Sequence, residues 1–133
     1  MVFQLAKIID NIQICAPRTV QHALAPMIGK LADWRQQNRQ RIAARVTVFQ
    51  QALAQLDGWD LRSCGAYFGF VRHPFGGADS VEVAQSMARK AGVLVIPGAF
   101  FGDGQEAMLR FAFANAGRDV IAQLPGRLKT LRV

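Results

Sequence analysis

The sequence has only two cysteines, Cys15 and Cys64, and they do not form a CxxC pair. Two isolated cysteines exclude a disulfide framework and a zinc site of the CxxC type, so we expect reduced thiols in a cytoplasmic protein. Histidine is equally scarce. His22 and His73 have no second ligand at metal spacing, so we expect surface or capping roles for them and no metal site.

Long hydrophobic runs and nucleotide-binding motifs are also missing. Lys7 and Asp10 interrupt the apolar N-terminus, no cleavage-site pattern follows, and no run reaches the length of a membrane span. We therefore expect neither a signal peptide nor a membrane association. The glycines at 98, 102 and 104 lack the Lys-Ser/Thr ending of a phosphate-binding loop.

Acidic residues are few: nine, against sixteen Lys and Arg, which gives a net charge of +7. The densest basic cluster is Arg35, Arg39, Arg41 and Arg45, within one helical stretch. No helix-turn-helix, RNA-binding aromatic signature or zinc-finger spacing accompanies it, so a charged helix face in water is the better explanation and nucleic acid is not the expected partner. A stand-alone basic module that binds nucleic acid or a small carboxylate ligand remains the alternative function.

The hydrophobic fraction of 51% in 133 residues indicates one folded domain, here with an attached arm. Apolar spacing predicts a helix over residues 1–14 and a second helix opened by Pro17. A long helix should follow from Leu31 to the Asp57-Gly58 break, with an apolar stripe. That stripe consists of Leu31, Trp34, Ile42, Phe49, Leu53 and Leu56.

Strand-like runs at 59–63, 66–71, 93–96 and 108–115 alternate with helical patterns in the second half of the chain. Asp79 and Glu82 form a capping box that opens a helix over 79–91, and Pro125-Gly126 should kink or split the C-terminal helix. This order predicts an α/β (α+β) fold: a two-layer sandwich whose small, mainly antiparallel sheet is covered by helices. We expect residues 1–30 to form a helical arm and residues 31–133 to form the domain.

The strand at 108–115 alternates with a period of two. Leu109, Phe111 and Phe113 can pack a core, and Arg110 points the other way, on a face shared with the methyl groups of Ala112 and Ala114. Sequence chemistry alone favours a solvated arginine there. The other interpretation is an anion site, because a planar guanidinium suits a carboxylate or phosphate.

Three segments carry a resemblance to a known family: residues 65–68 (GAYF), 92–102 (GVLVIPGAFFG) and 109–115 (LRFAFAN). In this order they resemble the C-terminal part of class I, pyridoxal-phosphate-dependent aminotransferases of the aspartate aminotransferase type. The resemblance implies a small domain in which Arg110 holds the substrate α-carboxylate. It also places Phe68 or Tyr67 near the substrate. Both residues could equally lie in the core, and the core is the preferred position for Phe68. No contact is assigned to the turn at 97–102.

The resemblance also shows what is missing. The family's chemistry needs a lysine that forms a Schiff base with the cofactor, and Lys7, Lys30, Lys90 and Lys129 do not have the expected sequence context. We therefore expect a fragment without catalytic residues of its own, inactive alone and without bound pyridoxal phosphate, whose partners are an absent large domain and a second subunit. The apolar arm should make it dimerise or self-associate. The segment 11–16 has no arginine to read a second carboxylate, which weakens the case for a dicarboxylic amino acid or 2-oxo acid.

Overall fold

A computed structural model describes residues 2–12 and 16–133, with the side chains of all of these except residues 2 and 11. The chain divides into two compact units, one that ends at Asn38 and one from Arg39 to Val133. Cys15 lies outside the described residues, whereas Cys64 is a free, half-buried thiol as expected. No helix in the described ranges is long and apolar enough to cross a membrane.

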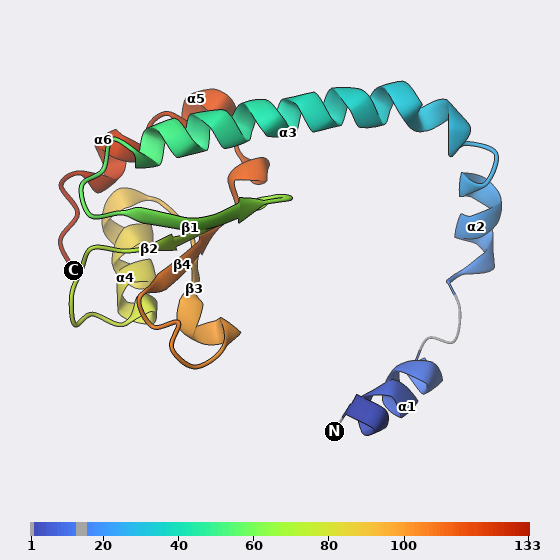
Figure 1. The fold of residues 1–133 in the computed structure, drawn as a ribbon, viewed down its shortest axis with the longest axis horizontal. Coiled ribbons are helices and arrows are strands. Elements are labelled where there is room, and N and C mark those ends of the chain that lie inside the picture. Colours follow the sequence, from blue (N-terminus) through green and yellow to red (C-terminus); the bar gives the residue numbers. More distant parts are fainter. Residues whose placement is uncertain (1, 13–15) are drawn as a thin grey trace. The chain divides into compact units, whose positions relative to one another are not determined.

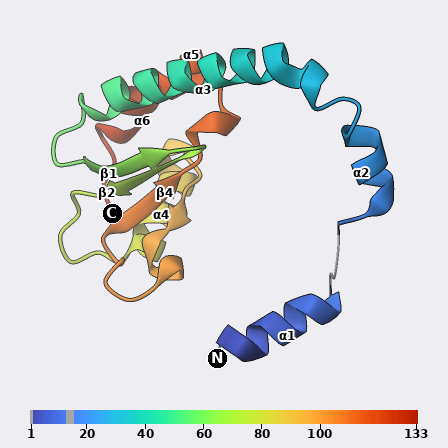
Figure 2. The ribbon, with the colours of Figure 1, turned by 45° about the vertical axis from the view of Figure 1, so that its right-hand side comes forward.

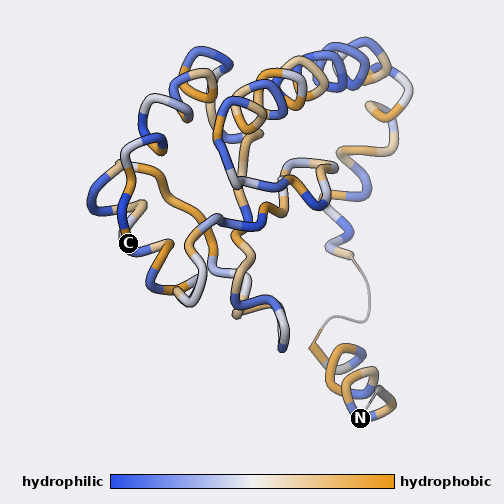
Figure 3. The backbone as a smooth tube through the Cα atoms, turned by 60° about the vertical axis from the view of Figure 1, so that its left-hand side comes forward, coloured by the Kyte–Doolittle hydropathy of each residue, from blue (hydrophilic) through white to orange (hydrophobic). Residues whose placement is uncertain are grey.

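The first unit consists of helices whose apolar side chains are exposed. It contains α1 (Val2–Ile12), α2 (Arg18–Leu24), a 3-10 turn η1 (Gly29–Leu31) and the beginning of α3 (Ala32–Leu53). Hydrophobic residues recur along α1 (Figure 3). An isolated helix of 11 residues is marginally stable in water, so the apolar face of α1 needs a partner surface. The exposed apolar residues of α1 are Phe3, Leu5, Ile8, Ile9 and Ile12.

The second unit is built on a four-stranded sheet in the order β1-β2-β4-β3. Its strands are β1 (Asp60–Gly65), β2 (Phe68–Arg72), β3 (Ile96–Pro97) and β4 (Met108–Phe111), and every neighbouring pair is antiparallel. The predicted antiparallel sheet is therefore confirmed. Its register aligns Ser63, Phe70, Arg110 and Ile96 in one row across all four strands.

Helices cover one face of this sheet. The C-terminal half of α3 lies on the same side as α5 (Arg118–Ile121) and α6 (Leu124–Leu128) in two views (Figures 1 and 2). The helix α4 (Ser80–Ser86) and the π-helical turn η2 (Met87–Ala91) also contribute to the core. This arrangement confirms the two-layer prediction. The fully buried large side chains are Phe49, Met87, Leu109, Val71, Val83 and Ser80.

Local signals that act within a few residues are confirmed. The Asp79 carboxylate accepts a hydrogen bond from the Val81 N–H at 2.7 Å, which caps the N-terminus of α4. Gly92 ends η2 in the left-handed conformation with a φ of 63°. The C-terminal helix is split as expected, but the break precedes Pro125, because proline is tolerated in the first turn of α6.

Three expectations about extent are wrong. The strand predicted at 108–115 ends at Phe111 and is followed by a 3-10 turn, η4 (Phe113–Asn115), although Phe113 is still buried. The strand predicted at 93–96 is reduced to β3, because the Val93 N–H bonds to the Met87 carbonyl in the helix cap. The long helix predicted to reach the Asp57-Gly58 break is α3, which already ends at Leu53.

Candidate functional site

Arg110 lies on the sheet face that the helices leave open. It pairs with Phe70 of β2 on one side and Ile96 of β3 on the other, and it is half-buried. Its guanidinium carbon is 4.4 Å from the centroid of the Phe68 ring and 4.7 Å from that of Phe101. Among the described residues Arg110 forms no hydrogen bond or ion pair, so its N–H donors are available to a ligand.

The neighbours of Arg110 differ from those expected. The strand alternation predicted a face lined by methyl groups, but two phenylalanine rings contact the guanidinium. Phe68 reaches it because it lies two residues before Phe70 on β2 and therefore shares its face. Phe68 is 39% exposed, so the core alternative for this residue is wrong.

Tyr67 lies in the turn between β1 and β2, next to Ala66, which has a positive φ of 48°. Its ring is 55% exposed. Its carbonyl accepts a hydrogen bond from the Ala114 N–H at 3.4 Å, so this turn is joined to η4, which directly follows the strand of Arg110.

Phe101 is the site residue that sequence reasoning missed. It ends the 3-10 turn η3 (Gly98–Phe101), and its ring meets that of Phe70 edge-on, at 6.0 Å and 88°. The available signal in the sequence was the Phe100-Phe101 pair between Gly98 and Gly102, since neighbouring aromatics in a turn can form an exposed apolar patch.

Arg45 is not part of a solvated helix face, contrary to the prediction for the basic cluster. Its side chain is half-buried and donates a hydrogen bond to the Ala114 carbonyl, which ties α3 to the turn after β4. Arg35, Arg39 and Arg41 are exposed, as expected. Three arginines of the cluster therefore face solvent, and the fourth, Arg45, makes a structural hydrogen bond.

His73 is buried, which contradicts the predicted surface or capping role. It is 5% exposed, and neither ring nitrogen has a hydrogen-bond partner among the described residues. His73 is buried because it directly follows β2, where its backbone N–H donates a hydrogen bond to the Ala107 carbonyl. The centroid of its ring lies 6.0 Å from that of Phe75. Burial lowers the pKa of His73 below its ordinary value of 6.5, while the Glu106 backbone and the Asp79 carboxylate act in the opposite direction.

This burial predicts a loss of stability in mild acid. The unfolded chain takes up a proton at His73 more readily than the folded chain, so the free energy of unfolding should fall as the pH drops below about 6.5. Urea unfolding at pH values from 7.5 to 5 should show this fall in the wild type, and a smaller fall in His73→Leu. Parallel pH profiles for the two proteins would contradict the prediction.

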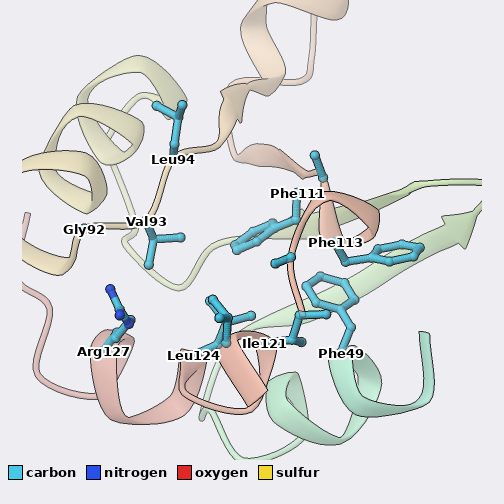
Figure 4. Close-up of a pocket in the computed structure, with 12 residues that line it drawn as sticks. Phe49, Gly92, Val93, Leu94, Phe111, Phe113, Ile121, Leu124 and Arg127 are labelled. Atoms are coloured by element: carbon cyan, nitrogen blue, oxygen red, sulfur yellow. The ribbon is translucent and has the colours of Figure 1, made fainter. Parts of the chain in front are cut away.

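One cavity in the described chain has a volume of about 320 Å³ and is not lined by Arg110. Figure 4 shows its apolar walls, with the Arg127 side chain at one end and the rings of Phe49 and Phe113 at the other. Arg127 is already bonded to the Ala91 carbonyl at 3.3 Å and to Gln123 Oε1 at 3.1 Å. The cavity therefore belongs to the helix-covered side of the sheet, whereas the candidate site is an open surface.

The described residues also bear on metal binding and on the reactivity of the Cys64 thiol. No group of three His, Cys, Asp or Glu side chains in the described ranges is arranged to hold a metal ion. Burial raises the pKa of the Cys64 thiol, so this group stays protonated near neutral pH. The site consists of an unpaired guanidinium in contact with aromatic rings. Such a group can bind an anion.

A sequence profile of the family "Aminotransferase class I and II" matches residues 1–128. The chain belongs to this family. The antiparallel sheet with helices on one face therefore belongs to a chain of this family. Enzymes of this family depend on pyridoxal phosphate.

Individual relatives agree with this assignment. The chain is 26% identical over 104 residues to aromatic-amino-acid aminotransferase 2 of Thermococcus litoralis, which covers 77% of this chain and 27% of that protein. It is 28% identical over 113 residues to the aromatic aminotransferase ISS1 of Arabidopsis thaliana, covering 84% and 28%. The structure of N-succinyldiaminopimelate aminotransferase from Mycobacterium tuberculosis matches with a TM-score of 0.73 and 25% identity, covering 92% of this chain and 33% of that one. The chain therefore spans about a quarter to a third of the length of these relatives.

The described residues around Arg110 do not fit the cofactor. Pyridoxal phosphate needs a lysine amine at the site, but Lys90 lies in η2 and Lys129 directly follows α6, two segments that pack on the helix-covered core. Lys90 also donates a hydrogen bond to the Arg132 carbonyl at 2.7 Å.

Proposed function

We propose that this chain is the small, substrate-binding domain of a pyridoxal-phosphate-dependent aminotransferase, and that Arg110 binds the α-carboxylate of an amino acid or 2-oxo acid. The observation that carries the proposal is the Arg110 guanidinium, which stands half-buried on an open sheet face with no carboxylate beside it in the described chain. Two parallel N–H donors of a guanidinium match the two oxygens of a carboxylate, so one contact fixes both position and orientation of the ligand.

Phe68 and Tyr67 are proposed to line the same site. The Phe68 ring already contacts the guanidinium, and the exposed Tyr67 ring is its neighbour in the turn. Aromatic walls beside one cation favour a substrate with an apolar or aromatic side chain over one with a second carboxylate. The two curated relatives, both named as aromatic aminotransferases, support this preference.

The remaining catalytic groups are proposed to come from another part of a longer protein. The chain spans 27–28% of its curated relatives, and its described lysines do not fit the cofactor beside Arg110. We propose that this domain is the C-terminal part, that a large domain supplies the Schiff-base lysine, and that the isolated chain is inactive.

The proposed binding can be tested on the chain itself. Charge-assisted hydrogen bonds to one exposed carboxylate are worth a few kcal/mol, so we expect phenylpyruvate to bind with a Kd of about 1 mM. An NMR titration should shift the Arg110 side-chain signals and the neighbouring amides of β2 and β4. The methyl ester of phenylpyruvate is the matched control, because it has no carboxylate. Equal shifts with acid and ester, or none near Arg110, would refute the proposed function.

The apolar helices of the first unit are proposed to pack on the large domain or on a second subunit. The side chains of Ile9 and Ile12 are 62% and 78% exposed, and no residue of α2 is buried. We expect the chain to self-associate in sedimentation experiments, and a variant without residues 1–30 to do so less. A wild type that stays monomeric at high concentration would argue against this role.

A further inference from the structure

The turn η3 brings Phe101 onto Arg110 from a different part of the chain. Phe101 lies nine positions before Arg110, and its ring centroid is 4.7 Å from the guanidinium carbon. The Phe101 ring also makes an edge-on contact with the Phe70 ring. Since Phe70 pairs directly with Arg110 in the sheet, the three side chains form one connected group.

The backbone of η3 is anchored to the core. The Ala99 N–H donates a hydrogen bond to Ser80 Oγ at 3.1 Å, and Ser80 is fully buried at the start of α4. Gly98 lies so close to Gln105 and Met108 that a Cβ at this position would overlap their backbone oxygens. The turn is therefore held by a buried hydroxyl and by close packing, which places Phe101 on a rigid support.

The contacts with the Phe68 and Phe101 rings restrict the rotation of the Arg110 side chain, and they use none of its N–H donors. An arginine side chain has several freely rotating bonds, and each must be ordered when it binds an anion. The N–H donors lie in the guanidinium plane, so a ring against the planar group leaves them available. A guanidinium that is oriented before the ligand arrives binds more tightly than a mobile one.

We propose that Phe101 is a positioning residue, which orients the Arg110 guanidinium for a carboxylate ligand through the anchored turn η3. This inference rests on the proposed function, because it concerns the same site. Phe101 itself does not need to touch the ligand. Its effect is exerted through Arg110, so it should be visible in the free protein as well as in binding.

The test compares Phe101→Leu with Phe100→Leu. Phe100 is the matched control, because it belongs to the same turn, is 71% exposed, and is not one of the rings in contact with Arg110. In the free wild type the ring current of Phe101 should change the NMR chemical shifts of the Arg110 side chain. We expect Phe101→Leu to lose much of this chemical-shift change and to weaken phenylpyruvate binding about threefold to tenfold. Phe100→Leu should leave both within about twofold, and Phe101→Tyr should restore both because it keeps the ring.

The two hypotheses fail in different ways. Arg110 signals and affinity that stay unchanged in Phe101→Leu would overturn the positioning role while the carboxylate site remained. A wild type that binds no carboxylate would refute the proposed function, and the Arg110 signals of the free variants would then still decide whether Phe101 orients the guanidinium. If Phe101→Leu does not fold, Phe101→Met gives the same comparison with a longer, flexible side chain.

Discussion

Replacing Phe49 with alanine is expected to lower the free energy of unfolding by about 3–5 kcal/mol, the usual cost of deleting a buried aromatic ring. Phe49 is 1% exposed, and its ring lies 5.5 Å from Phe111 and 5.3 Å from Phe113. A Cβ added at Gly69 would overlap the same ring, so the sheet approaches Phe49 as closely as it can. This side chain therefore joins α3 to the sheet, directly behind the strand of Arg110.

The loss should be large because the site cannot collapse around a smaller residue. Phe49 already lines the 320 Å³ cavity, so its removal would enlarge an existing void. Urea unfolding followed by circular dichroism measures the effect. Phe100→Ala is the control for removing a ring from an exposed position, with an expected change within about 0.5 kcal/mol. A loss below about 1 kcal/mol in Phe49→Ala would show that α3 does not depend on this contact.

The second large effect is expected from Arg110→Gln, which should weaken phenylpyruvate binding at least tenfold, or more than about 1.4 kcal/mol. Glutamine keeps a polar side chain of moderate length but removes the positive charge and the paired donors. The melting temperature should change little, because Arg110 has no ion pair or hydrogen bond in the described chain and loses only its ring contacts. Isothermal calorimetry or NMR titration gives the affinities.

Two further variants separate local from general electrostatics. Arg89→Gln removes the same charge from an exposed position on η2, so the net charge of +7 falls by one in both variants. Arg89→Gln should bind like the wild type if Arg110 acts by direct contact. Arg110→Lys should bind weakly, since an ammonium group cannot present two parallel donors. Equal weakening by Arg89→Gln and Arg110→Gln would show a non-specific charge effect.

The period-two alternation around Arg110 predicted which side chains are buried, but it did not predict where the strand ends. Leu109, Phe111 and Phe113 are all buried as predicted, even though the strand ends at Phe111. The apolar side chains turn toward the same core in a strand and in the short 3-10 turn that follows it. The burial pattern was therefore more robust than the boundary of the element, which depends on where β2 and β3 stop pairing.

The sequence by itself determined the helices, the strands, the capping of α4 by Asp79 and the side of β4 on which Arg110 lies, because these follow from side-chain patterns over a few neighbouring residues. Only the tertiary structure decided that the Phe101 ring contacts the Arg110 guanidinium, that Arg45 donates a hydrogen bond to the Ala114 carbonyl, and that the buried His73 ring nitrogens have no hydrogen-bond partner in the described chain. The two contacts join segments that are separated by a turn or distant in the chain, and the burial of His73 likewise depends on residues from other segments. They depend on the register of the strands and on the path of the connecting loops, which local patterns do not encode.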